Sequence, residues 1–368
     1  MNMQNFKLRR YEESDIDNIE QLFKTHFETR HIATRKLIFD WVARHNPAAG
    51  AETCYLVIED DGRIVAYEGR MPVDLMINGE KERGYFFHDT LVHPEYRKKG
   101  LGLAFVSSLK SAWEDATDTF AVGIWTNEFT HEILKRRRYY NLNAHYFVKP
   151  VNLTPVLMRI IRNKFIVQVI ALFGHGLIGL YDLFIPSRRY PDISISQIER
   201  FDQRFDTFAE KISRKFTLIV LRHSKYLNWK YITRPLANFT VFIAERNGNL
   251  SGYIILLLNK TMSGDIKLGL IADILAAPDD EQTIASLCQA AINFFRKENV
   301  NAIVCVLTNK SFIRIFKKYH FFKHPKHVPV MIANLHKHHA QELIKDIDNW
   351  FLTLGDSDGV VWNRDIAK

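Results

Sequence analysis

Cysteine is scarce in this chain of 368 residues, which contains three. Cys54, Cys288 and Cys305 lie in apolar runs, and none of them belongs to a CxxC pair or shows metal-ligand spacing. The sequence therefore excludes a disulfide framework and a cysteine-based metal centre. It predicts buried, reduced thiols in a reducing compartment.

Signals for secretion, nucleic-acid binding and metal binding are also missing. The first residues, MNMQNFKLRRYEES, contain no apolar segment, so we expect no secretion signal and a cytoplasmic location. The net charge is +9, but the basic residues are scattered and no nucleic-acid motif accompanies them, so we expect no nucleic-acid partner. The charge instead suits a phosphorylated cofactor, an anionic acceptor or a membrane surface. Histidines cluster between residues 324 and 339 without a fixed ligand geometry, so we expect no metal.

The most informative stretch that is present reads LVHPEYRKKGLG, at residues 91–102. An apolar strand end leads into a basic turn with two glycines, and apolar residues spaced by four (Leu101, Phe105, Leu109) predict a helix behind it. Glycines let backbone amides approach an anion, and a helix start adds unpaired amides and a positive dipole end. This order of parts predicts a diphosphate-binding turn.

The spacing Arg-x-x-Gly-x-Gly after Val-x-Pro resembles the acyl-CoA-binding signature of the GNAT (Gcn5-related N-acetyltransferase) superfamily. The resemblance implies acetyl-CoA, or another acyl-CoA, as co-substrate. The residues that it assigns to the pyrophosphate are Arg97, Lys98, Lys99, Gly100, Leu101 and Gly102. Those that it assigns to the pantetheine arm and the acyl carbonyl are Leu91, Val92 and Asn127.

The chain also contains a long internal repeat. The string GRIVAY at 62–67 returns as GNLSGY at 248–253, and other anchors recur at nearly constant intervals. These anchors are Trp41 with Pro47 and Trp229 with Pro235, Asp89 with Pro94 and Asp273 with Pro278, and Thr126-Asn127 and Thr308-Asn309. We predict an α/β fold of two tandem GNAT-like domains, each a central mixed, mostly antiparallel twisted sheet flanked by helices.

The expected units are a GNAT domain with the acyl-CoA site at 1–150 and an apolar helical connector at 151–194. A degenerate GNAT-like domain at 195–333 and a C-terminal helix with an acidic tail at 334–368 would follow. In the second copy, the run Asp279 to Thr283 replaces the basic glycine turn with three carboxylates and no glycine. We therefore expect one acyl-CoA site per chain, in the first copy.

The connector contains a strongly apolar stretch, residues 156–185, with basic residues on both sides. Three interpretations remain open, in decreasing order of preference. They are two short helices packed on the domains, peripheral membrane contact through an apolar face, and a membrane span. Gln168, His175 and Asp182 within the stretch argue against a span.

The chemistry of N-acyl transfer needs a base for the acceptor ammonium and a polarised thioester carbonyl. Asp89 is the best base candidate, since the family often places an acidic residue on this strand. His88 is the alternative, and strand alternation would point it to the opposite face. Because Asp273 occupies the same place in the second copy, Asp89 can instead be a structural tie between strands.

The acid that would protonate the CoA thiolate is less clearly marked. The family's usual tyrosine position falls on Leu134 in this sequence. Tyr139, Tyr140 or His131 can substitute, but the two tyrosines also match Phe321 and Phe322 as core aromatics, and the thiolate can leave unprotonated.

Three functions follow from these features. The first is an acyl-CoA-dependent N-acyltransferase that acts on a small-molecule or sugar-borne amine, with acetyl as the preferred acyl group. The second is an aminoacyl transferase of the peptidoglycan cross-bridge type, which has no need of the diphosphate turn. The third is a non-catalytic acyl-CoA-binding protein.

Overall fold

The computed structural model describes residues 6–48, 55–98, 120–124, 139–152, 190–260, 266–334 and 341–357, and single positions between 131 and 176. Most of the apolar stretch 156–185 lies outside these residues, as do Lys99, Gly100, Leu101, Gly102 and Asn127. Within the described part, no helix is both long and apolar enough to cross a membrane.

The first part of the chain alternates helices and strands around three long antiparallel strands. Its elements are β1 (Lys7–Arg10), a 3-10 turn (Glu13–Asp15), α1 (Ile16–Lys24), α2 (Thr29–His45), β2 (Tyr55–Asp60), β3 (Arg63–Ile77), β4 (Glu80–Val92), α4 (Pro94–Lys98), β5 (Phe120–Ile124) and β6 (Tyr140–Pro150). Tight turns join the long strands at Asp61-Gly62 and Asn78-Gly79, where all four residues have positive φ. Asp-Gly and Asn-Gly are the pairs that such hairpin turns require.

The second part also alternates helices and strands. It contains β7 (Ile193–Ile198), α9 (Arg204–Ser213), β8 (Leu218–Val220), α10 (Ser224–Leu227), the π-helical turn η3 (Asn228–Ile232), β9 (Phe239–Arg246), β10 (Asn249–Lys260), β11 (Lys267–Ala276), α11 (Glu281–Lys297), β12 (Ala302–Leu307), α12 (Lys310–Lys318) and β13 (Phe322–Asn334). A further tight turn, Asn247-Gly248, joins β9 to β10. The C-terminal part holds η5 (Leu343–Lys345), η6 (Ile347–Asn349), β14 (Trp350–Phe351) and η7 (Leu354–Asp356), in which η marks 3-10 turns. The predicted C-terminal helix is therefore wrong for the described residues 341–357.

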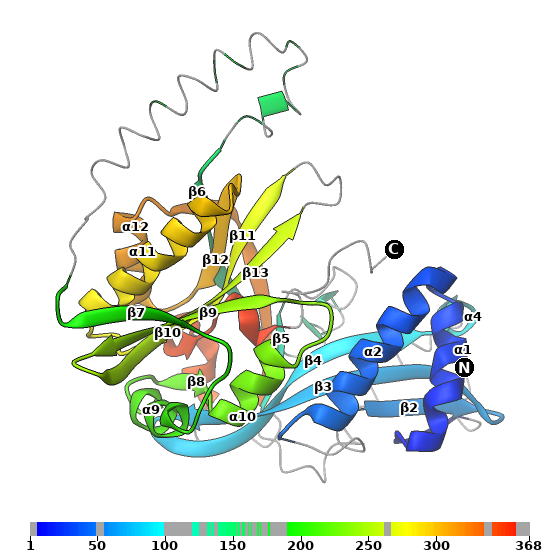
Figure 1. Cartoon of the computed structure of the whole chain (residues 1–368). Helices are drawn as coiled ribbons and strands as arrows, with labels where there is room; N and C mark the ends of the chain where they lie inside the picture. Colours follow the sequence, from blue (N-terminus) through cyan, green and yellow to red (C-terminus); the bar gives the residue numbers. More distant parts are fainter. Residues whose placement is uncertain are drawn as a thin grey trace.

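The described strands belong to one sheet, not to one sheet for each predicted domain. The order is β1-β2-β3-β4-β5-β13-β6-β12-β11-β10-β9-β7 (Figure 1). The last strand of each part lies among strands of the other, since β13 pairs with β5 and β6 pairs with β12. The expectation of two separate sheets is corrected by this exchange.

Helices cover both faces of the sheet. In the second part, Tyr253 packs against Phe205 of α9, whereas its neighbour Gly252 faces Leu287 of α11. Because successive strand residues point to opposite faces, α9 and α11 enclose β10 between them. In the first part, Tyr67 packs against Phe23 of α1 in the same way as Tyr253 packs against α9.

Two buried tryptophans, one from each part of the chain, pack against each other. The rings of Trp41 and Trp229 stack with centroids 4.6 Å apart and planes 14° apart. Each indole Nε1 donates a hydrogen bond to the backbone oxygen of the other residue, at 3.3 Å in both directions. The contact is thus reciprocal, and both rings are buried in one hydrophobic cluster that continues through both parts.

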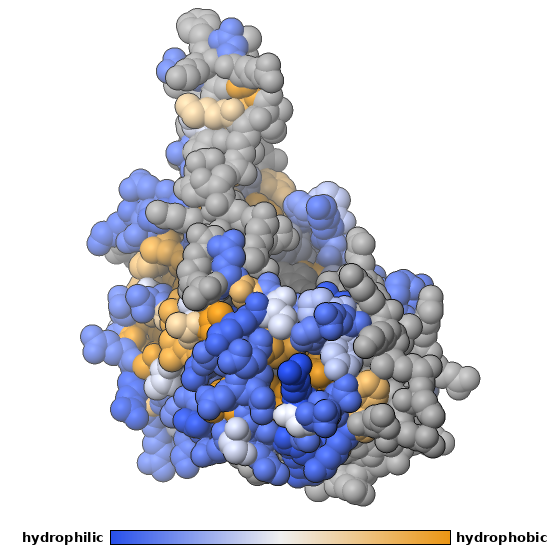
Figure 2. All heavy atoms as spheres, turned by 90° about the vertical axis from the view of Figure 1, so that its right-hand side faces the viewer, coloured by the Kyte–Doolittle hydropathy of each residue, from blue (hydrophilic) through white to orange (hydrophobic). Residues whose placement is uncertain are grey.

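The face that carries α1, α2 and β2 is mostly hydrophilic where its residues are described (Figure 2). The basic side chains of α1 and α2 on this face are largely paired with acidic ones. Lys36 Nζ lies 3.1 Å from Glu20, and Arg44 Nη1 lies 3.1 Å from Asp40. These ion pairs are typical of a solvated helix surface.

Candidate functional site

The end of β4 contains a bulge at the predicted base. Glu68 of β3 is opposite Thr90 and Gly69 is opposite His88, so Asp89 has no partner in the β3–β4 ladder. Asp89 has φ 36°, a left-handed conformation that side chains normally disfavour. A Cβ on Gly69 would lie 2.2 Å from the His88 carbonyl oxygen. Glycine at 69 therefore allows the two strands to approach at this bulge.

The bulge corrects the expectation that His88 and Asp89 point to opposite faces. Gly69 is opposite Tyr55 in β2 and opposite His88 in β4. The rings of Tyr55 and His88 lie on the same face of the sheet, with centroids 6.4 Å apart. The Asp89 carboxylate reaches Tyr67, whose ring lies 5.8 Å from that of Tyr55. Both candidates therefore lie on the face covered by α1 and α2, because the extra residue breaks the alternation.

Two buried side chains hold the Asp89 carboxylate. The Tyr67 hydroxyl donates to Oδ2 at 2.6 Å, and Arg35 Nη1 donates to the same oxygen at 3.3 Å. Arg35 is itself held over the ring of Phe27, 4.0 Å from its centroid. Burial, reinforced by the Asp89 charge, raises the pKa of Tyr67 well above its usual value, so the hydroxyl stays a donor.

The other carboxylate oxygen of Asp89 has a different environment. Among the residues that the structure describes, no hydrogen bond reaches Oδ1. The Asp89 side chain is 18% exposed, and Oδ1 is not among the fully buried polar atoms that lack a partner. The site thus combines a fixed carboxylate with one oxygen available to a ligand.

The first part of the predicted acyl-CoA segment continues β4 beside this site. Leu91 and Val92 are buried and pair with Tyr67 and Ala66 of β3. On the other side, the parallel β4–β5 ladder ends at Phe86 opposite Val122, within the described residues. The ladder between these two strands therefore ends three residues before Asp89.

The start of the basic turn is anchored by its arginine. α4 begins at Pro94, and Arg97 folds back so that Nη2 donates to the Val92 carbonyl at 3.1 Å. The same nitrogen lies 2.6 Å from His26 Nε2. Burial, and the Arg97 charge after it, lower the pKa of His26, which keeps the imidazole neutral and able to accept this bond. Nothing is described for the Lys98 side chain or for residues 99–102.

The structure does not bring Tyr139 to Asp89. Its ring lies 6.1 Å from that of Phe87, which directly precedes His88 in the strand and therefore points to the opposite face. Tyr140 accepts a hydrogen bond from Gln341 at 2.9 Å. Tyr139 therefore lies on the opposite face of the sheet from the Asp89 carboxylate.

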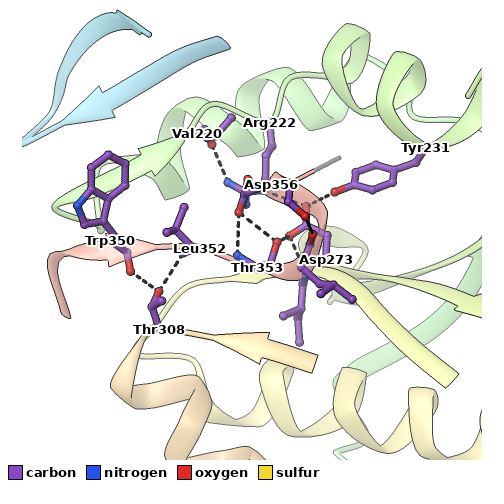
Figure 3. A network of polar contacts seen from close by, with 12 residues as sticks. Val220, Arg222, Tyr231, Asp273, Thr308, Trp350, Leu352, Thr353 and Asp356 are labelled. Carbon is purple, nitrogen blue, oxygen red and sulfur yellow. Dashed lines mark hydrogen bonds and ion pairs between the residues drawn. The ribbon is translucent and has the colours of Figure 1, made fainter. Parts of the chain in front are cut away.

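Asp273, the repeat counterpart of Asp89, has both oxygens occupied (Figure 3). Its Oδ2 accepts from Arg222 Nε at 3.0 Å, from the Tyr253 hydroxyl at 3.2 Å and from the Tyr231 hydroxyl at 3.3 Å. Its Oδ1 accepts from Thr353 Oγ1 at 3.0 Å and from the backbone amide of residue 274 at 2.9 Å. The Asp273 side chain is 0% exposed, so no ligand can reach it in this arrangement.

Sequence reasoning missed the residues that fix these carboxylates. Tyr67 and Tyr253 end the repeated strings GRIVAY and GNLSGY, and each donates to the aspartate of its own half. The repeated tyrosine was therefore a usable signal. No sequence signal marked Arg35 or Arg222, since these two arginines do not fall on matching positions of the repeat.

The start of α11 is closed where the first half has its basic turn. Asp280 caps the helix, accepting from the Thr283 amide at 3.1 Å, and also pairs with Arg246 at 2.9 Å. An internal carboxylate thus takes one of the helix-start amides that would otherwise be available to an anion. In the described part of the chain, no group of three or more His, Cys, Asp or Glu side chains is placed to hold a metal ion.

Comparison with known proteins identifies part of the chain. Residues 7–128 match the family model of the acetyltransferase (GNAT) domain. No curated protein matches the chain.

Solved structures resemble the chain over nearly its whole length. A GCN5-related N-acetyltransferase from Anabaena variabilis is 11% identical, with a TM-score of 0.62 over 90% of this chain and 73% of that one. A protein of unknown function from Enterococcus faecalis, described as a probable N-acyltransferase, is 11% identical, with a TM-score of 0.61 and the same coverage. N-myristoyltransferase from Saccharomyces cerevisiae with bound myristoyl-CoA is 13% identical, with a TM-score of 0.55 over 90% of this chain and 83% of that one. Residues 7–128 therefore match a GNAT acetyltransferase domain, and the chain has a GNAT-like α/β fold, a mixed sheet flanked by helices.

Proposed function

We propose that this protein is an acyl-CoA-dependent N-acyltransferase with one active site, in its N-terminal half. The observation that carries the proposal is the partly exposed Asp89 carboxylate, which lies on the part of β4 beyond its ladder with β5, eight residues before Arg97. The proposed reaction moves an acetyl group from acetyl-CoA to the amine of a small-molecule or sugar-borne acceptor. The GNAT domain match over this region supports the same class of reaction.

In the proposed mechanism, Asp89 Oδ1 accepts a proton from the acceptor ammonium. Tyr67 and Arg35 hold Oδ2, which fixes the carboxylate and leaves Oδ1 directed at the acceptor. The free amine then attacks the thioester carbonyl carbon, and a C–N bond forms. The C–S bond breaks to release CoA thiolate, and the proton that the new amide nitrogen loses passes to solvent water. Backbone amides at the parted end of β4 would stabilise the oxyanion that forms on the carbonyl oxygen.

Acyl-CoA would bind along the parted strand and the basic turn. Leu91 and Val92 would contact the pantetheine arm with Asn127, and the segment from Arg97 to Gly102 would hold the diphosphate. Arg97 is already tied to the end of β4 through Val92, which sets its position before the cofactor arrives. The neutral His26 imidazole accepts a second hydrogen bond from the same Arg97 side chain.

We further propose that the two halves are copies of one GNAT-like unit. Gly84 and Leu268 each lie five residues before the aspartate of their half, and each begins the parallel ladder to the next strand. The reciprocal Trp41–Trp229 contact joins two residues that occupy matching repeat positions. The acidic cap at Asp280 then supports a single diphosphate site per chain.

The first experiment measures thermal stability with and without acetyl-CoA. Wild-type protein should be stabilised, because a ligand that binds the folded state raises Tm. A chain with Arg97→Glu and Gly100→Glu should lose this effect. Lys225→Glu, a charge reversal at an exposed position of the second half, is the matched control and should keep it. A wild-type chain without stabilisation would exclude the CoA site and favour the aminoacyl transferase.

The second experiment separates an enzyme from an acyl-CoA-binding protein. Release of free thiol from acetyl-CoA is followed with a panel of small and sugar-borne amines. Longer acyl-CoAs are included because one structural neighbour carries myristoyl-CoA. Stabilisation by acyl-CoA without amine-dependent thiol release would favour the non-catalytic alternative.

A further inference from the structure

The C-terminal segment Trp350–Ser357 lies between the ends of β11 and β12 (Figure 3). On the β12 side, Thr353 forms an isolated bridge with Leu307, and the Leu352 amide donates to Thr308 Oγ1 at 2.9 Å. On the β11 side, Thr353 Oγ1 donates to Asp273 Oδ1 at 3.0 Å. The segment therefore contacts both strands at once.

These contacts lie where the two strands part. The parallel ladder between β11 and β12 ends at Ile271 opposite Cys305. In the first half, the matching ladder ends at Phe86 opposite Val122. The C-terminal segment thus occupies the counterpart of the gap that the proposed function assigns to the thioester and the acceptor.

The fit of the segment is close. A Cβ on Gly355 would lie 2.1 Å from the Tyr231 hydroxyl and 2.9 Å from the Ala272 carbonyl oxygen. Trp350 is buried, and η7 is closed by a capping box in which Asp356 accepts from the Thr353 amide at 2.7 Å. A side chain at 355 could not be accommodated without movement of the surrounding backbone.

Charge also holds the segment in place. Arg222 Nη2 donates to both oxygens of Asp356 at 2.9 Å, while its Nε binds Asp273. All three side chains are buried. One arginine thus bridges the strand aspartate and the segment aspartate, and removal of the segment would leave buried charge without its partner.

We infer that the C-terminal segment is a resident occupant of the second half's site and keeps that site closed to ligands. Thr353 Oγ1 donates to Asp273 Oδ1, the oxygen that matches Oδ1 of Asp89. In the first half, this is the position from which an acceptor N–H would donate. The inference rests on the proposed equivalence of the two halves, and it assigns the segment the place of an acceptor.

Hydrogen–deuterium exchange on the full chain tests this inference. Thr353→Val removes the hydroxyl with little change in shape, and Gly355→Val introduces the excluded Cβ. Amides of residues 350–357 and 270–276 should exchange at least about tenfold faster in both variants, because the loss of one buried charge-assisted hydrogen bond is of that size. Thr240→Val is the matched control, since its hydroxyl makes no hydrogen bond among the described residues, and its exchange should match wild type.

A synthetic peptide of residues 348–357 provides the second measurement. Added to the Gly355→Val chain, it should slow exchange at 270–276 again, whereas in wild type the site is already filled. Two results would overturn the inference. One is unchanged exchange of residues 350–357 in Thr353→Val. The other is equal acceleration over the whole second half, which would make the segment a general structural support. If Gly355→Val does not fold, Thr353→Val decides alone.

The outcome is distinguishable from failure of the proposed function. Thr353→Val should keep the stabilisation by acetyl-CoA that wild type shows, because that site lies in the other half. Absence of acetyl-CoA stabilisation in wild type would refute the proposed function. The exchange measurements would still show whether the segment fills the gap between β11 and β12.

Discussion

Gly69 offers the sharpest test of how the Asp89 site is built. In Gly69→Ala, the new Cβ would lie 2.2 Å from the His88 carbonyl oxygen and 2.8 Å from Cε1 of Tyr55. Carbon and oxygen without a bond stay more than 3 Å apart, so β3 and the bulge must separate by roughly 1 Å. The displaced backbone carries Asp89 with it.

The expected cost has a structural and a catalytic part. Overpacking against backbone should lower the free energy of unfolding by about 3 kcal/mol. A displacement of this size at a catalytic group should lower kcat by about a hundredfold. Gly62→Ala is the control, because a Cβ there meets nothing within 4 Å. Its left-handed φ of 77° should cost about 1 kcal/mol without a change in kcat.

Urea unfolding and thiol release from acetyl-CoA measure the two parts separately. Both variants should unfold cooperatively, with the Gly69→Ala midpoint well below that of Gly62→Ala. If Gly69→Ala keeps wild-type kcat and stability, the close approach at the bulge does not position Asp89. The mechanism proposed for this site would then be refuted.

Two further predictions concern charge. Asp89→Asn should lower kcat at least about a hundredfold, while acetyl-CoA still raises Tm. Asp273→Asn should leave kcat within about twofold and lower the free energy of unfolding by about 3 kcal/mol. Equal turnover of Asp89→Asn and wild type would exclude Asp89 as the base. His26 is neutral in the folded protein because its pKa is lowered. Its contribution to the free energy of unfolding is therefore fully present above the unfolded-state pKa of about 6.5. The contribution is lost as the pH falls through the lower pKa of the folded state. Urea unfolding at pH 7 and pH 5 should therefore show a larger loss for wild type than for His26→Gln, which can still accept from Arg97, and identical losses would contradict this role.

Local features of the sequence predicted the parts of the site that depend on neighbouring residues. The aspartate five residues before Pro94 follows from spacing, and the family model of the GNAT domain matches residues 7–128 around it. The orientation of His88 relative to Asp89 did not follow, because the left-handed φ of Asp89 depends on Gly69 and Tyr67 of another strand. Alternation along one strand cannot reveal a bulge that tertiary contacts impose.

The C-terminal segment shows the same limit over a longer distance. Its sequence LGDSDG contains two aspartates, and aspartate is rarely buried without a partner. The partner is Arg222, which lies 134 residues earlier in the chain. The exchange of β6 and β13 was equally hidden, because an apolar strand does not specify which edge it joins.

The strand exchange joins the Asp89 site of the first half and the closed Asp273 site of the second half in one folding unit. β5, which borders the proposed acyl-CoA site, obtains its other neighbour from β13 near the end of the chain. β12, which borders the closed site, obtains its other neighbour from β6 of the first half. Each half therefore completes the sheet of the other, and loss of the second half would leave β5 with an exposed edge. The second half can thus be required for the first site without binding a ligand itself, and a C-terminal segment that fills its gap preserves the packing that this support needs.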